Sequence, residues 1–370
     1  MSNKYDYLIV GAGLFGATVA QILSERGKRC AVIEKRERVG GNIATEEVDG
    51  ITVHKFGAHI FHTDERKVWE YVNRFAEFDN FVYSPIASCK GKLYNLPFNM
   101  FTFYQMFGSR TPAEARAIID AQCAASGIVE PKNFEEKALA TVGEDLYRTL
   151  IKGFIEKQWG RDCKFLPVSA FGRVPLRFTF DNGYYTDRYR GVPVGGYSPM
   201  VEKMLENAEV LMGVDYLSDR KRFDGMAELT VYTGEIDRFY GYRLGELEYR
   251  SLRFETETLD IPDCQGSAVV DYTEYEVPYT RIIEHKHFDR TNASDRTVIT
   301  REYPEKFTAG ADPYYPINDE KNDALYAEYA ELAASEKRVL FGGRLAEFKY
   351  YDMDETVARA MAMVDRIIGK

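Results

Sequence analysis

A glycine-rich turn close to the first residue constrains the fold more than any other feature of this chain. The stretch YLIVGAGLFGATVAQIL passes from an apolar strand through Gly11, Gly13 and Gly16 into the first turns of a helix. These glycines allow a tight turn, close approach of the backbone to a pyrophosphate, and close packing of the helix on the strand. A second strand ends at Glu34, 18 residues after Gly16. The pattern predicts a βαβ unit that binds a dinucleotide, with the pyrophosphate at the helix N-terminus and a ribose at Glu34.

Two further stretches favour FAD over NAD as this dinucleotide. Directly after Glu34 the chain reads KRERVGGN, where a short basic stretch precedes a glycine pair and Gly41 and Asn42 are the candidate contacts. The late stretch VLFGGRLAEF reads as a strand and a glycine turn that returns to the flavin, although Gly342 and Gly343 could also form a turn alone. The sequence shows no second glycine-turn unit for a nicotinamide cofactor. The chain is therefore similar to FAD enzymes of the glutathione-reductase type, including relatives of the amine oxidases.

Composition and charge exclude several classes of protein. The formal charge is -10, whereas a nucleic-acid binder needs a basic surface. No run of 18 apolar residues predicts a membrane span, and five scattered cysteines predict neither a disulfide framework nor a zinc site. No histidine spacing typical of a metal site is present, so we expect no metal. We expect no signal peptide and a cytoplasmic location.

The order of predicted elements indicates a mixed α/β fold with three interleaved parts. A Rossmann-like FAD-binding domain is assigned to residues 1–63, 194–245 and 331–370. A helical insertion domain is assigned to residues 64–79 and 98–165, where Thr111 and Pro112 form a strong helix start and Gly143 interrupts a later helix. A mostly antiparallel sheet that binds the substrate is assigned to residues 80–97, 166–193 and 246–330.

Several longer motifs then suggest a family. The chain resembles the prokaryotic UDP-galactopyranose mutases, and the resemblance rests on GAHIFHT, EKQWGR, RFTFDN, PVGGY, YTRIIEHKHF, YYPIND and GRLAEFKYYDMD. It implies an isomerase that interconverts UDP-galactopyranose and UDP-galactofuranose by a ring contraction without net redox change. It also implies reduced FAD, whose N(5) attacks the anomeric carbon with UDP as leaving group. The product would supply galactofuranose for cell-surface glycans.

The resemblance implies a set of substrate-binding residues. Arg173 and Arg281 match arginines that bind the diphosphate, and planar guanidinium groups suit that task. Tyr350 matches a tyrosine that contacts the diphosphate. Either Tyr314 or Tyr315 has the same role, and Tyr315 fits better because it precedes Tyr350 by 35 residues.

The sugar and the base of the substrate are implied to meet aromatic side chains. Tyr184 matches an aromatic residue that stacks on uracil, and Trp159 matches a tryptophan that lines the sugar pocket, although Trp159 could instead be core packing. Phe154 stands where bacterial relatives often carry tyrosine, so a hydroxyl near the substrate is lost and altered contacts are expected. For Arg177, Arg188 and Arg190 a surface salt bridge remains the simpler interpretation.

On the cofactor side, His59 matches the histidine beside the isoalloxazine ring and is implied to shape the surroundings of N(5). Arg344 and Asp352 match contacts to the pyrophosphate and ribityl region, with the Met353 backbone beside them. Val214 is implied to present its backbone to adenine. His62 is interpreted as structural.

Two other classes of function stay open at this point. An amine-oxidase-like flavin oxidase or desaturase would have an apolar tunnel to the flavin with few cationic groups, and a non-catalytic FAD-binding or UDP-binding module has no need for both sets of motifs. The expected partners are UDP-galactose, UDP-galactofuranose and an external reductant for the flavin. The family also implies a homodimer or larger homo-oligomer.

Overall fold

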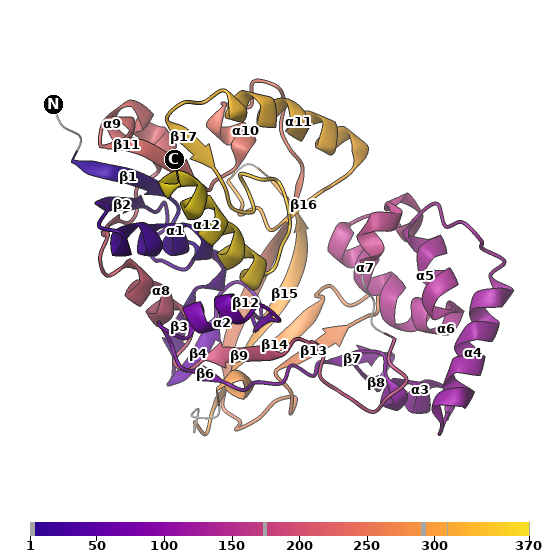
Figure 1. The fold of residues 1–370 in the computed structure, drawn as a ribbon. Helices are drawn as coiled ribbons and strands as arrows, with labels where there is room; N and C mark the ends of the chain where they lie inside the picture. Colours follow the sequence, from indigo (N-terminus) through magenta and orange to yellow (C-terminus); the bar gives the residue numbers. More distant parts are fainter. Residues whose placement is uncertain (1–3, 173–175, 290–293, 309, 370) are drawn as a thin grey trace.

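The chain folds around a parallel five-stranded sheet, a seven-stranded sheet and a lobe of helices (Figure 1). The computed structural model describes residues 4–172, 176–289, 294–308 and 310–369. In the described part of the chain, no helix combines the length and the apolar character that crossing a membrane requires.

The five-stranded sheet begins with the predicted βαβ unit. Its strand order is β10 (Glu209–Leu211), β2 (Cys30–Ile33), β1 (Tyr5–Val10), β11 (Ala227–Tyr232) and β17 (Val339–Phe341), and all neighbours are parallel. Residues of β1 and β2 alternate between two hydrophobic clusters, one on each face, as a sheet buried on both sides requires.

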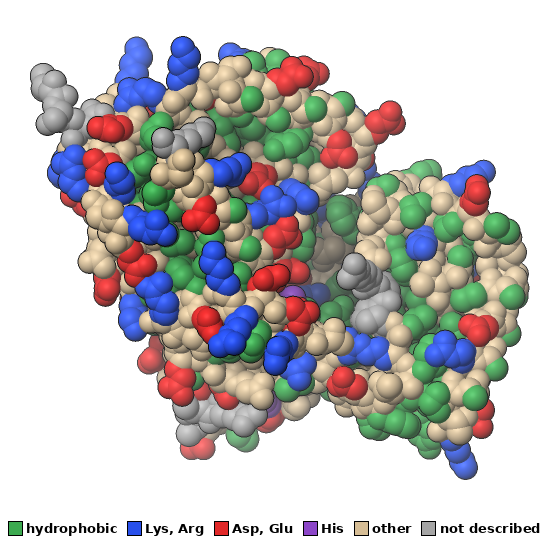
Figure 2. Space-filling model, viewed as in Figure 1, with side chains coloured by type: hydrophobic (Ala, Val, Ile, Leu, Met, Phe, Trp, Pro, Cys, Tyr) green, Lys and Arg blue, Asp and Glu red, His purple; other side chains and the backbone are tan. Residues whose placement is uncertain are grey.

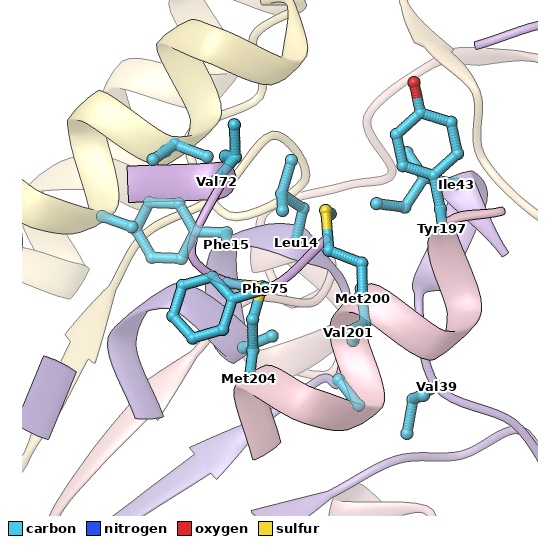
Figure 3. Close-up of a cluster of buried hydrophobic side chains, with 14 of the residues drawn as sticks. Leu14, Phe15, Val39, Ile43, Val72, Phe75, Tyr197, Met200, Val201 and Met204 are labelled. Atoms are coloured by element: carbon cyan, nitrogen blue, oxygen red, sulfur yellow. The ribbon is translucent and has the colours of Figure 1, made fainter. Parts of the chain in front are cut away.

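One face of this sheet is covered by three helices, α1 (Leu14–Glu25), α8 (Tyr197–Leu205) and α12 (Met353–Ile368). Figure 3 shows Leu14 and Phe15 of α1 close to Met200 and Met204 of α8. The opposite face is covered by η5 (Tyr216–Asp219), α9 (Arg220–Asp224) and α10 (Ile236–Phe239), which supply Tyr216, Phe223 and Phe239 to the second cluster. Each helix therefore buries an apolar face against the strands, and the carboxyl ends of β1 and β2 stay free for a ligand.

The seven-stranded sheet is antiparallel except where β13 pairs with β7. Its order is β16 (Tyr315–Pro316), β12 (Tyr249–Leu259), β15 (Thr297–Lys306), β14 (Arg281–Glu284), β13 (Val269–Tyr272), β7 (Ile86–Cys89) and β8 (Lys92–Asn95). Two small sheets lie apart from these. In one, β3 (Thr45–Val48) pairs with β4 (Ile51–His54), and in the other, β9 (Tyr189–Pro193) lies between β5 (Phe61–Thr63) and β6 (Phe78–Asp79).

The helical lobe forms within the predicted range 98–165 and packs around its own core. The predicted range 64–79 does not belong to it, because α2 (Arg66–Val72) packs against α12 and β5 and buries Val68, Tyr71 and Val72 in the core beside the parallel sheet. The lobe comprises α3 (Met100–Phe107), α4 (Pro112–Ala125), α5 (Phe134–Val142), α6 (Glu144–Leu146), the π-helical turn η2 (Tyr147–Ile151) and α7 (Lys152–Trp159). Thr111 caps α4 in a capping box with Pro112 at the first helical position, which confirms the predicted start. Gly143 ends α5 in a conformation with φ of 79°, which confirms the predicted interruption. The other short helices are α2 (Arg66–Val72), η1 (Gly41–Ile43), η3 (Cys163–Phe165), η4 (Val168–Phe171) and η6 (His285–Phe288).

Two segments of the predicted antiparallel sheet domain also differ from their predicted arrangement. The only strand in the described part of 166–193 is β9, which pairs with β5 and β6 and does not join the seven-stranded sheet. Residues of the predicted sheet region 246–330 also begin α11 (Glu320–Ala334), whose first turn is capped by Asp319. Tyr329 and Leu325 of α11 pack with Leu247, so spacing of four residues along a buried face sets a helix there.

Candidate active site

A cavity of about 380 Å³ begins at the carboxyl ends of β1 and β2 and reaches the seven-stranded sheet. Figure 2 shows the surface hollowed between the helical lobe and the rest of the molecule. Lining residues include the glycine turn at one end and Arg281, Tyr315 and Tyr350 at the other. The cavity therefore joins the predicted cofactor residues to several of the predicted substrate residues.

The glycine turn has the geometry that a pyrophosphate site needs. Gly11 has φ of 108°, a conformation that side-chain-bearing residues rarely adopt. A Cβ atom on residue 16 would lie 2.0 Å from the carbonyl oxygen of Gly11. Gly13 precedes α1 without a side-chain cap, so the free N–H groups of the first helical turn face the cavity, where Leu14 and Phe15 also lie. These residues fit a bound dinucleotide.

Glu34 lies where an acid should receive ribose hydroxyls. Its side chain is buried, and its carboxylate accepts the N–H groups of Ala12 and Arg36 at 2.9 Å each. Each carboxylate oxygen can accept a second hydrogen bond, so the group can serve the glycine turn and a ligand together.

Other predicted cofactor residues surround this end of the cavity. Gly41 lies in η1 with φ of 57°, close enough that a Cβ atom there would meet the Cα of Gly13 at 3.0 Å. Asn42 and Val214 also line the cavity. The N–H of Val214 donates to the carbonyl oxygen of Glu34, which leaves the Val214 carbonyl as the group to offer to a base.

The C-terminal segment returns to the same cavity, as the sequence predicted. Arg344, Asp352 and Met353 all line it, and Asp352 precedes α12 without making a side-chain cap. The Arg344 guanidinium donates to the carbonyl oxygen of Tyr314 and lies 5.0 Å from the centre of the Tyr350 ring. Its buried Nε has no hydrogen-bond partner among the described residues, so one donor remains for a ligand.

Arg281 is held between two carboxylates by the register of the sheet. It lies opposite Asp271 of β13 on one side and opposite Glu302 of β15 on the other. Its Nε is 3.1 Å from a carboxylate oxygen of Asp271 and 3.7 Å from one of Glu302. Burial opposes the charge of Arg281, but Asp271 and Glu302 hold its pKa well above the ordinary value. Both ion pairs use Nε, so the terminal nitrogens of Arg281, for which no ion pair is found among the described residues, are available to an anionic ligand.

Three tyrosines, Tyr314, Tyr315 and Tyr350, line the cavity together with Arg281 and Arg344. The rings of Tyr315 and Tyr350 are 5.7 Å apart, and the Tyr350 hydroxyl donates to Asp352 at 3.2 Å. The Tyr314 ring contacts Phe254, with 5.8 Å between ring centres. Burial, with Glu302 nearby, raises the pKa of Tyr315 to about 12 although Arg281 and Arg344 oppose the rise. Tyr315 therefore keeps a hydroxyl proton to donate at neutral pH.

His59 lines the cavity as a neutral ring with one defined tautomer. Burial lowers its pKa to about 4, and the nearby Arg344 adds to the effect although the Gly57 hydrogen bond opposes it. Its Nδ1 is 2.8 Å from the carbonyl oxygen of Gly57, which can only accept, so Nδ1 carries the proton. The Nε2 lone pair of His59 is thus free to accept a hydrogen bond or a proton.

Three further predicted substrate residues, Phe154, Trp159 and Tyr184, are not among the lining residues of the cavity. The Phe154 ring lies 5.6 Å from the Arg281 guanidinium, and Tyr184 contacts Tyr83 and Tyr185. Trp159 packs against the core of the helical lobe, which agrees with the alternative that it is a core residue. Arg173 lies outside the described residues.

Sequence reasoning missed an aromatic pair that contributes to the cavity wall. His62 stacks on Tyr185 with 3.7 Å between ring centres, and both line the cavity. Arg177 and Arg190 were interpreted as surface ion pairs, but they donate to the carbonyl oxygens of Tyr184 and Tyr185 at 2.7 and 2.8 Å. Their role is to shape this aromatic segment. The adjacent tyrosines in NGYYTD were the only available signal.

The fold and the cavity define an α/β enzyme with a Rossmann-like dinucleotide-binding domain beside an arginine- and tyrosine-lined pocket. The family model described as NAD(P)-binding Rossmann-like domain matches residues 9–75. The family model described as UDP-galactopyranose mutase matches residues 149–350.

Full-length comparisons agree with these matches. The chain is 39% identical to a probable UDP-galactopyranose mutase of Klebsiella pneumoniae, over 100% of this chain and 96% of the relative. It is 36% identical to a dTDP-fucopyranose mutase of Escherichia coli, over 96% of each chain. A structure of reduced UDP-galactopyranose mutase shares the fold with a TM-score of 0.77 and 14% identity, over 99% of this chain and 94% of that chain. The chain belongs to the UDP-galactopyranose mutase family, and it is an isomerase.

Proposed function

We propose that this enzyme interconverts UDP-galactopyranose and UDP-galactofuranose with bound reduced FAD. The observation that carries the proposal is the continuity of one cavity from the glycine turn of β1 and α1 to Arg281, Tyr315 and Tyr350. A dinucleotide held at the first end brings its reactive ring towards a diphosphate sugar held at the second.

The cofactor end fits FAD in its shape and in its donors. The first turn of α1 and the Arg344 guanidinium would meet the pyrophosphate, Glu34 the adenosine ribose, and Asp352 the ribityl chain. Reduced FAD supplies an electron-rich nitrogen that can form a bond to a sugar carbon without net electron transfer. This assignment also agrees with a sequence that shows no second glycine-turn unit for a nicotinamide cofactor.

The substrate end fits a diphosphate leaving group. Arg281 offers its terminal nitrogens while Asp271 and Glu302 fix the direction of the guanidinium. Tyr315 and Tyr350 can donate from protonated hydroxyls, since burial raises the pKa of both side chains. Such donors stabilise the negative charge that grows on the diphosphate as the bond to the sugar breaks. Arg173, which the family resemblance pairs with Arg281, would add a second cation.

His59 is suited to act as a proton acceptor beside the flavin ring. Because its Nδ1–H is bound to Gly57, its Nε2 can accept a hydrogen bond from a cofactor or sugar donor. Aromatic residues Tyr184 and Phe154 would meet the base and the sugar. The arginines and tyrosines of the cavity contrast with the apolar tunnel, poor in cationic groups, that an amine-oxidase-like enzyme would need.

The 36% identity to a dTDP-fucopyranose mutase favours a second candidate substrate, dTDP-fucopyranose. The two substrates differ in the base methyl group, the ribose 2′-hydroxyl and the sugar 6-hydroxyl. The same diphosphate site would serve both, so the arginine and tyrosine cluster does not separate them.

One experiment decides between these substrates. The purified holoenzyme is reduced with dithionite and incubated in parallel with UDP-galactofuranose and dTDP-fucofuranose, and each pyranose product is followed by chromatography. We expect conversion of the UDP sugar to be preferred. Preferred conversion of the thymidine sugar would establish the second candidate, and conversion of neither would refute the proposed function.

A further inference from the structure

Lys157 is a buried lysine of α7 to which the proposed function gives no role. Only 8% of its surface is exposed. Its ammonium donates to three backbone carbonyl oxygens, those of Tyr272 at 2.7 Å, Val277 at 3.0 Å and Tyr279 at 2.8 Å. All three belong to the end of β13 and the turn towards β14. A buried cation with three acceptors therefore ties a helix of the lobe to one turn of the sheet.

Two other contacts join the helical lobe to the same turn, one through α7 and one through η2. Gly153 of α7 lies so close to the turn that a Cβ atom would be 2.3 Å from the carbonyl oxygen of Thr273. The Thr273 hydroxyl donates to the carbonyl oxygen of Thr149 at 2.8 Å. The helix backbone thus packs directly on the turn, and Lys157 supplies the hydrogen bonds that fix their relative position.

The two elements joined by Lys157 carry opposite sides of the proposed substrate site. Phe154 stands one turn before Lys157 on α7, and its ring lies 5.6 Å from the Arg281 guanidinium. Asp271 and Arg281 flank the turn on β13 and β14. A shift of the turn relative to α7 would therefore move Arg281 relative to Phe154, although Lys157 itself does not line the cavity.

We infer that Lys157 is a positioning residue that sets the diphosphate-binding arginine against the helical side of the substrate pocket. The inference rests on the proposed function. Burial lowers the pKa of Lys157 to about 8 although Asp271, Glu274 and Glu276 oppose the shift, so the ammonium is the main form at neutral pH. The cost of burying this charge is offset by three aligned carbonyl acceptors.

Lys157→Met tests the inference because it keeps an unbranched side chain of nearly the same length and removes every donor. Lys286→Met is the matched control. Its ammonium also donates to three backbone carbonyl oxygens, at Pro262, Ser294 and Arg296, none of which lines the cavity. For each variant, FAD content, thermal stability, binding of UDP to the holoenzyme, and KM and kcat with UDP-galactofuranose are measured.

We expect Lys157→Met to weaken UDP binding and to raise KM about tenfold, with full FAD content, because a displacement of about 1 Å is enough to misplace a positioning group. Lys286→Met should lose comparable thermal stability and leave UDP binding and KM unchanged. Equal UDP affinity in Lys157→Met and wild type, or equal losses in both variants, would overturn the inference.

If Lys157→Met does not fold, Thr273→Val loosens the same contact more gently, and it should raise KM in the same direction. An unchanged KM in Thr273→Val would then count against the inference. These outcomes are distinct from failure of the proposed function, in which the wild-type enzyme itself would not isomerise the sugar nucleotide.

Discussion

Replacing Gly16 by alanine tests how the glycine turn makes a cofactor site. A Cβ atom at this position would lie 2.0 Å from the carbonyl oxygen of Gly11 and 3.1 Å from Cγ2 of Ile9. Cβ atoms are essentially never found within 3.0 Å of such a neighbour, so α1 must move from β1 by at least 1.0 Å, the difference between 3.0 and 2.0 Å. Overpacking of this kind costs about 1–3 kcal/mol of stability.

The same movement should cost cofactor affinity. A displacement of about 1 Å stretches hydrogen bonds of about 2.9 Å from the first turn of α1 to the pyrophosphate beyond their useful range. Each charged hydrogen bond lost is worth about 1.5–3 kcal/mol, so the dissociation constant of FAD should rise at least about tenfold.

Gly27→Ala is the control for a general loss of stability. Gly27 follows α1 at its other end with φ of 75°, and a Cβ atom there would meet nothing within 4 Å. Alanine should therefore cost about 1–2 kcal/mol of backbone strain and leave FAD binding intact. Apo-protein titrated with FAD by calorimetry, with thermal melting in parallel, separates the two effects. Unchanged FAD affinity in Gly16→Ala, or equal losses of affinity in both variants, would refute the reasoning.

The remaining predictions concern single side chains. Glu34→Gln should weaken FAD binding about tenfold, because a charged acceptor is worth about 1.5–3 kcal/mol, and calorimetry would detect the change. Arg281→Met should lower turnover at least about 100-fold with FAD retained, as loss of a transition-state donor does, and bound flavin absorbance is the control. Tyr315→Phe should raise KM for the UDP sugar more than Tyr314→Phe does, and similar effects would contradict the assignment. Burial lowers the pKa of His285 to about 3, so the neutral ring stabilises the fold only while the pH stays high. The free energy of unfolding should therefore fall by up to about 3 kcal/mol as the pH drops from about 6.5 to about 4. In urea denaturation, the midpoint of His285→Gln should fall less than that of the wild type over this pH range.

Local features of the fold could be predicted from sequence. The glycine turn before α1, the cap at Thr111 and the interruption at Gly143 depend on residues that are neighbours in the chain. Their geometry follows from backbone conformations that few residue types can adopt. The link between Glu34 and the turn also follows, because a βαβ unit has a fixed hand and a nearly fixed length.

Features that depend on long-range pairing could not be predicted in the same way. β9 was placed in the wrong sheet because its partners, β5 and β6, precede it by more than a hundred residues. No sequence motif singles out Asp271 and Glu302, and only the register of three strands places them on either side of Arg281. Strand pairing buries these carboxylates beside the arginine, and such proximity between distant residues cannot be read from amino-acid composition.

The choice between Tyr314 and Tyr315 shows the middle ground. Spacing in the sequence favoured Tyr315, and the structure places its ring beside Tyr350 while Tyr314 packs on Phe254. Both tyrosines line the cavity, but adjacent side chains in an extended segment diverge, and the ring that contacts Tyr350 is that of Tyr315.

In the proposed reaction, the reduced flavin acts on the sugar nucleotide without net transfer of electrons. The most direct test of this claim compares the initial rate of UDP-galactopyranose formation from UDP-galactofuranose with the flavin fully oxidised and fully reduced, while the reductant consumed is counted against the sugar converted. The account predicts turnover only with reduced flavin, and many sugars converted for each equivalent of reductant. Equal rates with oxidised flavin, or one equivalent of reductant consumed for each sugar, would contradict it.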